Sequence, residues 1–525
     1  MHQGRPATSA HWAFAFAACA VGAGLASLWI GQDANWDLRN YHYHNAHAFL
    51  SGRFGWDIAP AMHGTYHNPL PDLPFYWLAN HVPSARAVAL VMSLSTAAAA
   101  FFFLRILALL FPGKALHIAL AALIGLTGAT GVSTVSSTMH EWPLAALLLA
   151  ATWLVLASRR RRLLALAGFL CGIAFGLKLT YGVFALALCV ALPARDKWPR
   201  WVVGYLLFGG FVLVGFAVSY GFWAWILWRD FGNPFFPYFN TVFQSPYWEI
   251  ASFHDDRFGP RTFLQALGFP LLFARESRFV SEGSFRDYRL ATVYVLAALC
   301  LAKALLARER RWDVPWRVLG IFALAAYLIW LPLFAIYRYL LPLEVLSGAF
   351  VVGAFAYLLK DVRARYIVLV LIAVLLVGTT RKTGWERVPF TEGAYFKVVP
   401  PAVPPDSLVL LASPQPMAYA IPFFPSDTRF VATANGFLAM HQSNVLQREV
   451  VRLVASHNGP LYLLEYRLQG AQSDFALREL RLLRERESCA VLHSNIDNDS
   501  MRLCRLQRAR LAALVPAAML RTPGD

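Results

Sequence analysis

The sequence is poor in charge. Only 15% of its 525 residues are Asp, Glu, Lys or Arg, whereas 58% are hydrophobic. Soluble globular domains carry roughly 25% charged residues. This balance excludes an ordinary soluble domain and indicates a polytopic membrane protein.

Signatures of soluble catalysis are also missing. The sequence has no Walker phosphate loop, no Gly-x-Ser-x-Gly elbow and no dinucleotide-binding glycine fingerprint. It shows no heptads, no low-complexity tract and no obvious inverted duplication of its halves. The last absence disfavours a repeat-built transporter. Any chemistry must therefore come from polar groups placed around membrane helices.

Cysteine is scarce as well. Four of the six cysteines fall in apolar runs, and only Cys489 and Cys504 lie outside them. A hairpin around the tight turn "NIDN" pairs residue 494 with 499 and so sets 489 opposite 504. A cross-strand disulfide in an oxidising compartment and a pair of reduced strand cysteines fit this pattern equally well.

The apolar residues are gathered in about eleven runs that we expect to be transmembrane helices, because about 20 apolar residues cross a bilayer. The first run is longer than a signal-peptide core, so we expect it to be the first span. The runs are 12–30, 86–104, 115–134, 142–158, 163–177, 181–194, 202–228, 290–306, 318–335, 342–359 and 366–380.

Basic residues account for a formal net charge of +17 and occupy alternate short loops between these runs. The positive-inside rule makes those loops cytoplasmic, together with the N-terminus. Nucleic acid is not expected as a partner, because the basic groups are interleaved with spans rather than gathered on one soluble face. The other face then carries loops 31–85 and 229–288, the turns near residues 140, 178 and 338, and everything after 381.

The C-terminal region has a different pattern. Short strand-like runs such as "SLVLLA", "TRFVAT" and "GPLYLLEY" alternate with helical stretches at 442–457 and 472–486. We therefore expect a transmembrane domain over 1–385 with outer loops 31–85 and 229–288, a small α/β domain over 395–510 on the outer face, and a tail over 511–525.

The first outer loop concentrates polar residues just after the first span, in "WDLRNYHYHNAHAFLSGR". If a helix starts at Asp37, then Asp37, Tyr41 and His44 share one stripe. Leu38, Ala46, Phe49 and Leu50 would offer apolar surface to lipid headgroups, which predicts a helix along the interface. In the competing interpretation, Asp37 merely caps the N-terminus of this helix.

Four stretches in this order resemble the GT-C superfamily of polytopic glycosyltransferases, which use polyprenyl-phosphate sugars, and most closely its mannosyltransferase-like branches. The first is the loop above with the following "TYHNPLPDLPFYWL". The others are "MHEWPLAALLLAATWL", the glycine-rich "GFLCGIAFGLKLTYGVFALAL" and "YRYLLPLEVLSG". Together they cover about the first 350 residues. The resemblance implies an enzyme of the bacterial inner membrane that transfers a sugar to a lipid, glycan or protein acceptor on the periplasmic face, with inversion.

The resemblance also implies roles for single residues. Asp37 matches the first-loop acid that serves as catalytic base, and Glu141 matches a second outer acid. Lys178 and Arg338 are candidates for neutralising the leaving phosphate, although either could instead extend to the interface without a ligand. The remaining candidates would line the sugar pocket: Tyr41, Asn45, Tyr66, Asn68 and His140.

Metal ligation is less well supported. The first outer loop lacks the paired acids of the family pattern, because Asp33 and Asp37 stand four apart. His63 and His67 invite a zinc site, but Gly64 and Pro69 disfavour the helix that would hold that geometry, and no cysteine accompanies them. We therefore assign no metal ligand and leave a divalent cation open. A lipid-linked saccharide transporter or flippase and a non-catalytic scaffold stay as alternatives.

Overall fold

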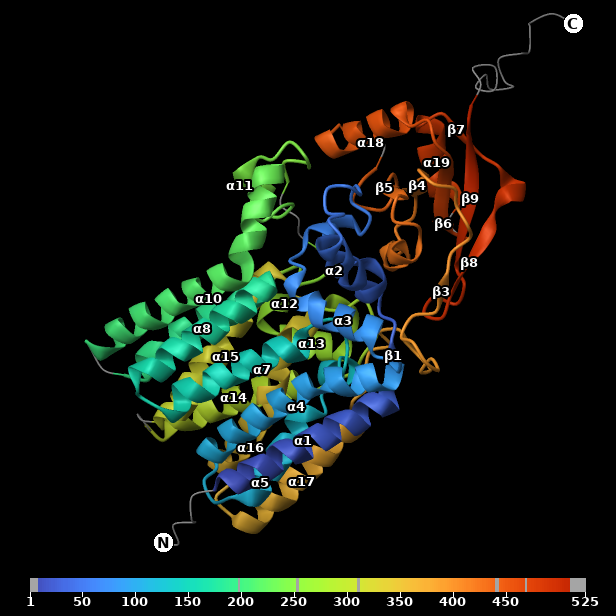
Figure 1. Ribbon diagram of the computed structural model, residues 1–525. Coiled ribbons are helices and arrows are strands. Elements are labelled where there is room, and N and C mark those ends of the chain that lie inside the picture. Colours follow the sequence, from blue (N-terminus) through green and yellow to red (C-terminus); the bar gives the residue numbers. More distant parts are fainter. Residues whose placement is uncertain are drawn as a thin grey trace, which may run out of the picture. The chain divides into compact units, whose positions relative to one another are not determined.

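The computed structural model describes residues 8–196, 199–251, 255–308, 312–439, 443–467 and 470–509 (Figure 1). The chain divides into two compact units. The first, here called the membrane unit, takes residues 1–33, 86–225 and 254–390, and the second, the α/β unit, takes 34–85, 226–253 and 391–525. The expected tail at 511–525 lies outside the described residues.

The membrane unit is a helical bundle, and each of the eleven apolar runs contains a helix. Seven of the described helices are long and apolar enough to cross a membrane alone. The long helices are α1 (Ser9–Ile30), α4 (Ala85–Leu110), α10 (Arg200–Phe231), α14 (Arg289–Leu306), α15 (Val314–Leu333), α16 (Leu341–Leu358) and α17 (Val362–Thr379). The shorter ones are α5 (Ala115–Leu126), α6 (Ala129–Ser133), α7 (Glu141–Ala157), α8 (Arg161–Leu177), α9 (Gly182–Ala191), α12 (Phe263–Leu267) and α13 (Phe269–Arg275).

The run expected over 115–134 is not one helix. Helix α5 ends at Leu126, and α6 starts only at Ala129. Asp287 accepts a hydrogen bond from the N–H group of Ala129 (2.7 Å), and Glu344 accepts one from Gly131 (2.7 Å). These buried carboxylates take up backbone groups that a continuous helix would have bonded internally, which is why the helix breaks here.

A row of glycines sets the packing of the short helix α8. Added Cβ atoms at Gly168 and Gly172 would lie 2.3 Å and 2.1 Å from carbonyl oxygens of α10. Such small-residue rows let membrane helices approach backbone to backbone. The close contact fixes the end of α8, where Lys178 follows directly.

The α/β unit contains a seven-stranded sheet, drawn in orange and red in Figure 1, with the strand order β3-β8-β9-β6-β4-β5 and β7 also paired with β9. Strand β4 runs parallel to β5 and β6, and β9 is antiparallel to its neighbours. The strands are β3 (Val398–Val399), β4 (Leu408–Leu411), β5 (Arg429–Ala432), β6 (Leu461–Tyr466), β7 (Leu482–Arg484), β8 (Ala490–Ser494) and β9 (Met501–Arg508). The helices of this unit are α2 (Tyr43–Leu50), α3 (Leu73–His81), α11 (Asn240–Phe243), α18 (Val445–Ser456) and α19 (Gly470–Glu479). The remaining strand pair, β1 (Gln32–Asp33) and β2 (Arg387–Val388), belongs to the membrane unit.

The expected helix over 472–486 was too long. Helix α19 ends at Glu479, Arg481 adopts a left-handed conformation, and the chain then forms β7. Leu482 is buried in this strand, opposite Arg508 of β9. Edge pairing with β9 therefore overrides the helical pattern of the sequence.

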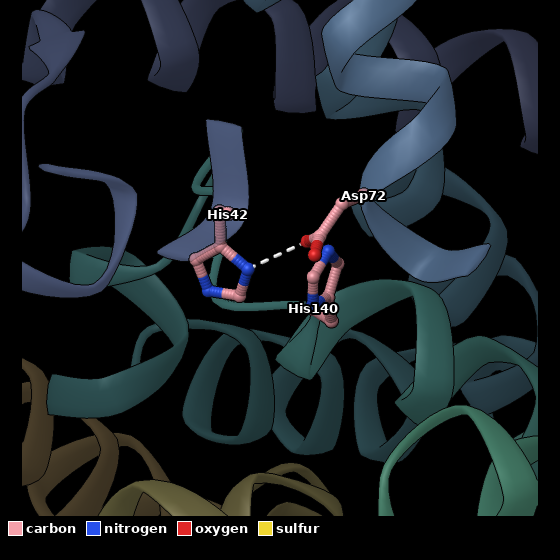
Figure 2. A group of neighbouring side chains, drawn as sticks. All are labelled: His42, Asp72 and His140. Carbon is pink, nitrogen blue, oxygen red and sulfur yellow. Dashed lines mark hydrogen bonds and ion pairs between the residues drawn. The ribbon is translucent and has the colours of Figure 1, made fainter. Parts of the chain in front are cut away.

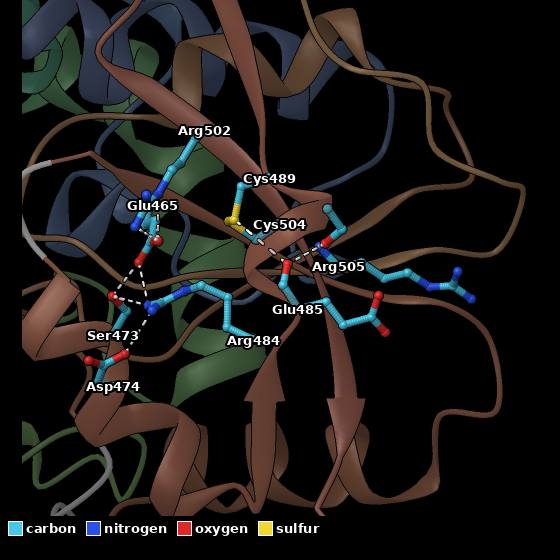
Figure 3. Close-up of a disulfide and its surroundings, with 10 residues drawn as sticks. Glu465, Ser473, Asp474, Arg484, Glu485, Cys489, Arg502, Cys504 and Arg505 are labelled. Carbon is cyan, nitrogen blue, oxygen red and sulfur yellow. Dashed lines mark hydrogen bonds and ion pairs between the residues drawn. A yellow bond between two sulfur atoms is a disulfide. The ribbon is translucent and has the colours of Figure 1, made fainter.

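The predicted register of the hairpin β8–β9 is confirmed, since Ala490 pairs with Leu503. The next pair outward is Cys489 and Cys504, which form a disulfide (Figure 3). Nearby, the fully buried Glu465 binds Arg484 (2.9 Å) and Arg502 (2.7 Å). The disulfide and this ion cluster tie β6, β7, β8 and β9 together.

Part of the first predicted loop belongs to the α/β unit through a buried ion pair. Arg53 donates to Asp57 (2.8 Å) and to the carbonyl of Thr428 (2.6 Å), and Asp57 accepts from the N–H of Phe430 (2.8 Å). Burial raises the pKa of Asp57, and the Arg53 guanidinium opposes that rise. The loop is thereby fixed beside β5.

Candidate active site

In the membrane unit, an ion pair joins the start of α7 to the end of α8. The Lys178 ammonium lies 2.6 Å from Oε1 of Glu141 and also donates to the carbonyl of Met139 (3.0 Å). The Glu141 side chain is fully buried, and that of Lys178 is 20% exposed. Glu141 is the first residue of α7, and Lys178 follows the last residue of α8, where the backbone becomes extended. Both charges therefore stand at helix termini.

Arg338 joins this pair through shared neighbours. Its guanidinium lies 5.4 Å from the ring centroid of Tyr339, and the Lys178 ammonium lies 5.0 Å from the same centroid. Arg338 also contacts the sulfur of Met139 (3.7 Å). Three of the predicted site residues, Glu141, Lys178 and Arg338, are thus brought together. Two cations beside one aromatic ring suit the binding of a phosphate group.

Tyr339 and Met139 were not identified from the sequence. Both lie inside quoted motifs, "YRYLLPLEVLSG" and "MHEWPLAALLLAATWL", but an aromatic ring and a thioether carry no chemical signature at a single position. Only the fold shows that they connect the two cations. The available signal in the sequence was that Tyr339 directly follows the candidate Arg338.

The segment that precedes Glu141 is held by buried carboxylates. Asp33 accepts hydrogen bonds from the backbone N–H (2.9 Å) and the hydroxyl (3.0 Å) of Thr138. Asp287 and Glu344 hold the other end of the segment, at residues 129–131. His140 takes a left-handed conformation directly before α7. These contacts fix Met139, and with it the carbonyl that positions Lys178.

In the α/β unit, Asp37 does not cap its helix. The helical segment starts at Trp36, and the side chain of Asn35 accepts the N–H of Leu38 (2.9 Å), while Asp37 makes no side-chain capping bond. The interpretation of Asp37 as a simple cap is therefore wrong. The residue is only 8% exposed and sits in a first helical turn, where the helix dipole favours an anion.

A π-helical turn over Leu38–His42 follows Asp37 and precedes α2. Turns of this kind inside helices often occur at functional sites. They also change which side chains share a face. Leu38 and Ala46, expected to face lipid headgroups, are fully buried within the protein, whereas Leu50 is 61% exposed. The expected apolar lipid-facing stripe is thus wrong for Leu38 and Ala46.

Tyr41 and Asn45 both contact Gly64. The amide of Asn45 donates to the Gly64 carbonyl (2.8 Å), and a Cβ atom at Gly64 would lie 2.6 Å from the Tyr41 ring. The Tyr41 ring also meets the ring of His67 edge-on, with centroids 4.8 Å apart. Gly64 therefore sets the position of two predicted pocket residues.

Tyr66 and Asn68 have clear structural contacts. Tyr66 is buried against Phe236 (centroids 4.7 Å apart), and the side chain of Asn68 accepts the N–H of Leu70 (3.1 Å). His63 and His67 lie on and next to a 3₁₀ turn, Met62–Tyr66, and His67 hydrogen-bonds the hydroxyl of Tyr238 (2.8 Å).

His42 and Asp72 form a further buried pair in this unit, at 2.6 Å (Figure 2). An imidazole and a carboxylate are donor types that bind divalent cations. The sequence did not single out this pair, because the two residues lie thirty positions apart. His42 ends the π-helical turn before α2, and Asp72 ends a 3₁₀ turn before α3.

Comparisons with known proteins identify the fold. No protein-family model and no curated protein matches the chain. Among solved structures, ArnT from Cupriavidus metallidurans bound to undecaprenyl phosphate is 13% identical, with a TM-score of 0.50 over 95% of this chain and 98% of that chain. An Archaeoglobus fulgidus oligosaccharyltransferase tethered with an acceptor peptide is 11% identical, with a TM-score of 0.44 over 86% and 69% of the two chains. The first likeness shows the fold alone: this chain shares the polytopic fold of ArnT, which agrees with the fold expected from its motifs.

Proposed function

We propose that the chain is a membrane glycosyltransferase, which takes a sugar from a polyprenyl-phosphate donor and passes it to an acceptor on the periplasmic face. The observation that carries this proposal is the convergence of Lys178 and Arg338 on Tyr339 at the ends of membrane helices. The fold shared with ArnT, which was crystallised with undecaprenyl phosphate, supports it. So does the Cys489–Cys504 disulfide, which fits an oxidising compartment.

The two cations act on the leaving group. When the bond between the anomeric carbon and the phosphate oxygen breaks, negative charge grows on the departing polyprenyl phosphate. Fixed cations stabilise that charge without having to reorganise. The Met139 carbonyl and Glu141 already orient the Lys178 ammonium. A bound phosphate would therefore replace only some of the hydrogen bonds of this ammonium.

Asp37 is the proposed base. An acceptor hydroxyl attacks the anomeric carbon from the face opposite the phosphate, and its proton passes to the Asp37 carboxylate, which gives inversion. Glu141 assists. Its Oε2 is buried and has no hydrogen-bond partner among the described residues, so it can accept a hydrogen bond from a substrate hydroxyl.

We extend the proposal to the sugar pocket named from the sequence: Tyr41, Asn45, Tyr66, Asn68 and His140. The contacts of Tyr41 and Asn45 with Gly64 support a fixed geometry for these two. His42 and Asp72 are the residues that would hold a divalent cation in the α/β unit, if the reaction uses one. The acceptor is a lipid, a glycan or a protein.

The replacement of Asp37 by Asn tests the assignment. In proteoliposomes that contain a polyprenyl-phosphate sugar, this variant should still fold and bind donor but lose transfer by about 10²–10⁴-fold, the usual contribution of a general base. Asp406→Asn, at an exposed turn, is the matched control and should keep full activity. Transfer at the wild-type rate by the Asp37 variant would refute the catalytic role.

A further inference from the structure

The membrane unit has a cavity of about 230 Å³ at the end that carries the basic loops. Its apolar wall comes from the end of α7 and the start of α15, and its polar wall comes from the segments after α7 and α9. The principal lining residues are Val155, Ser158, Arg159, Arg195, Val314 and Val318. Glu141 and Lys178 lie at the opposite ends of α7 and α8, so this cavity is separate from the proposed active site.

Arg195 is the distinctive group in this cavity. Its side chain is only 4% exposed. One nitrogen donates to the Ser158 carbonyl, and Nε lies 3.7 Å from a carboxylate oxygen of Asp196. Nη1 is buried and has no hydrogen-bond partner among the described residues. An unsatisfied donor on a buried charged group is unfavourable, so this nitrogen favours an acceptor inside the cavity.

The charge around the cavity has the sign that attracts an anion. Asp196 is already bound by Arg159 at 2.9 Å, so it only partly balances Arg195. The described flanking segments 158–162, 195–196, 199–200 and 313–317 hold two aspartates, Asp196 and Asp313. The same segments hold seven arginines: Arg159, Arg160, Arg161, Arg162, Arg195, Arg200 and Arg317.

We propose that this cavity binds the phosphate group of an anionic membrane phospholipid. Arg195 would donate Nη1 to a phosphate oxygen, because the planar guanidinium is matched to phosphate geometry. Leu156 and Val314 are partly exposed beside it and would contact the acyl chains. Basic pockets between membrane helices on the cytoplasmic side are a general form of lipid-headgroup site.

The chemistry of the site would also accept free phosphate, and the test must separate the two sources. The purified full-length chain is placed in phosphatidylcholine nanodiscs, with or without phosphatidylglycerol, and its thermal unfolding is measured. A third sample receives inorganic phosphate instead. Phosphatidylglycerol should raise the midpoint of unfolding, and neither phosphatidylcholine alone nor inorganic phosphate should do so. An equal shift with inorganic phosphate would overturn the lipid assignment.

Arg195→Gln is the critical variant, and Arg162→Gln, at an exposed position of the same basic region, is its control. The first should weaken phosphatidylglycerol binding by about tenfold, the equivalent of one charged hydrogen bond, and the second should leave binding unchanged. Equal losses in both variants would mean that only surface charge matters, which would refute the site.

A measurement on the wild type covers the case in which the Arg195 variant does not fold. Native mass spectrometry counts the phosphatidylglycerol and phosphatidylcholine molecules that stay bound to the chain. At least one phosphatidylglycerol should be retained in preference to phosphatidylcholine. Equal retention of both lipids would overturn the proposal, whether or not the chain transfers a sugar.

Discussion

The ion pair between Glu141 and Lys178 should respond unequally to the loss of each partner. Lys178→Met leaves a carboxylate whose side chain is fully buried. Breaking a buried pair in this way costs about 3–5 kcal/mol of unfolding free energy. Glu141→Gln leaves an ammonium that is 20% exposed and still has the Met139 carbonyl, so the loss should be about 1.5–3 kcal/mol, the value of one charged hydrogen bond.

Ligand binding should separate the two variants more sharply, with the loss again in Lys178→Met. If Lys178 contacts the donor phosphate, Lys178→Met should weaken polyprenyl-phosphate binding by about tenfold to a hundredfold, which corresponds to about 1.5–3 kcal/mol. Glu141→Gln should keep or improve binding, because it frees the ammonium from its counter-ion. Thermal unfolding in detergent and titration with polyprenyl phosphate measure the two effects, and the double variant should recover stability relative to Lys178→Met. Wild-type affinity in Lys178→Met, or a larger loss of stability in Glu141→Gln, would refute the reasoning.

Three further predictions concern the α/β unit. Gly64→Ala should displace the Tyr41 ring, because the added Cβ atom would lie 2.6 Å from it, and should therefore reduce sugar transfer. Gly221→Ala is the control and should leave sugar transfer unchanged, because its added Cβ atom would lie in open space. Equal activity of both variants would argue against a fixed pocket. Asp57→Ala should lower the free energy of unfolding by about 3–5 kcal/mol, because it leaves the buried Arg53 guanidinium without its carboxylate partner. Denaturant unfolding measures this change, and a loss below about 1 kcal/mol would contradict the prediction. Burial lowers the pKa of His44 from 6.5 to about 3, so the unfolded chain binds a proton between these pH values that the folded chain does not. Stability should therefore fall as the pH drops from 6.5 toward 3, and His44→Gln should flatten that dependence in pH-resolved melts; an unchanged slope would contradict the assignment.

The sequence predicted the parts of the fold that depend on local patterns. Apolar run length predicted the membrane helices, and short strand-like runs predicted β4, β5 and β6. The hairpin register followed from the length of the turn at "NIDN", because a tight turn leaves few pairings. Patterns of this kind are set by local physics and survive in the fold.

Features that depend on tertiary contacts were not predictable from the sequence. The break after Leu126 arises because Asp287, just before α14, and Glu344, in α16, accept hydrogen bonds from the backbone there. The π-helical turn after Asp37 changes the face of the helix that the ideal period of 3.6 had assigned.

The candidate site shows the same division. Lys178 and Arg338 were singled out because a charge at the edge of a membrane span is costly and therefore informative, and Glu141 was singled out from the family resemblance. Tyr339, Met139 and Asp33 were missed, since an aromatic ring, a thioether and one more loop acid look ordinary at single positions. Their roles come from geometry: Tyr339 contacts both cations, and Asp33 holds the segment that orients Lys178.

The most direct test of the proposed activity follows the fate of the lipid. Purified chain in proteoliposomes is given a panel of polyprenyl-phosphate hexoses and pentoses, with membrane extracts as the acceptor source, and free polyprenyl phosphate is quantified. The account predicts that one donor releases polyprenyl phosphate in step with the glycosylation of an acceptor. Donor that crosses the bilayer intact, or that stays unchanged with every sugar tested, would contradict it.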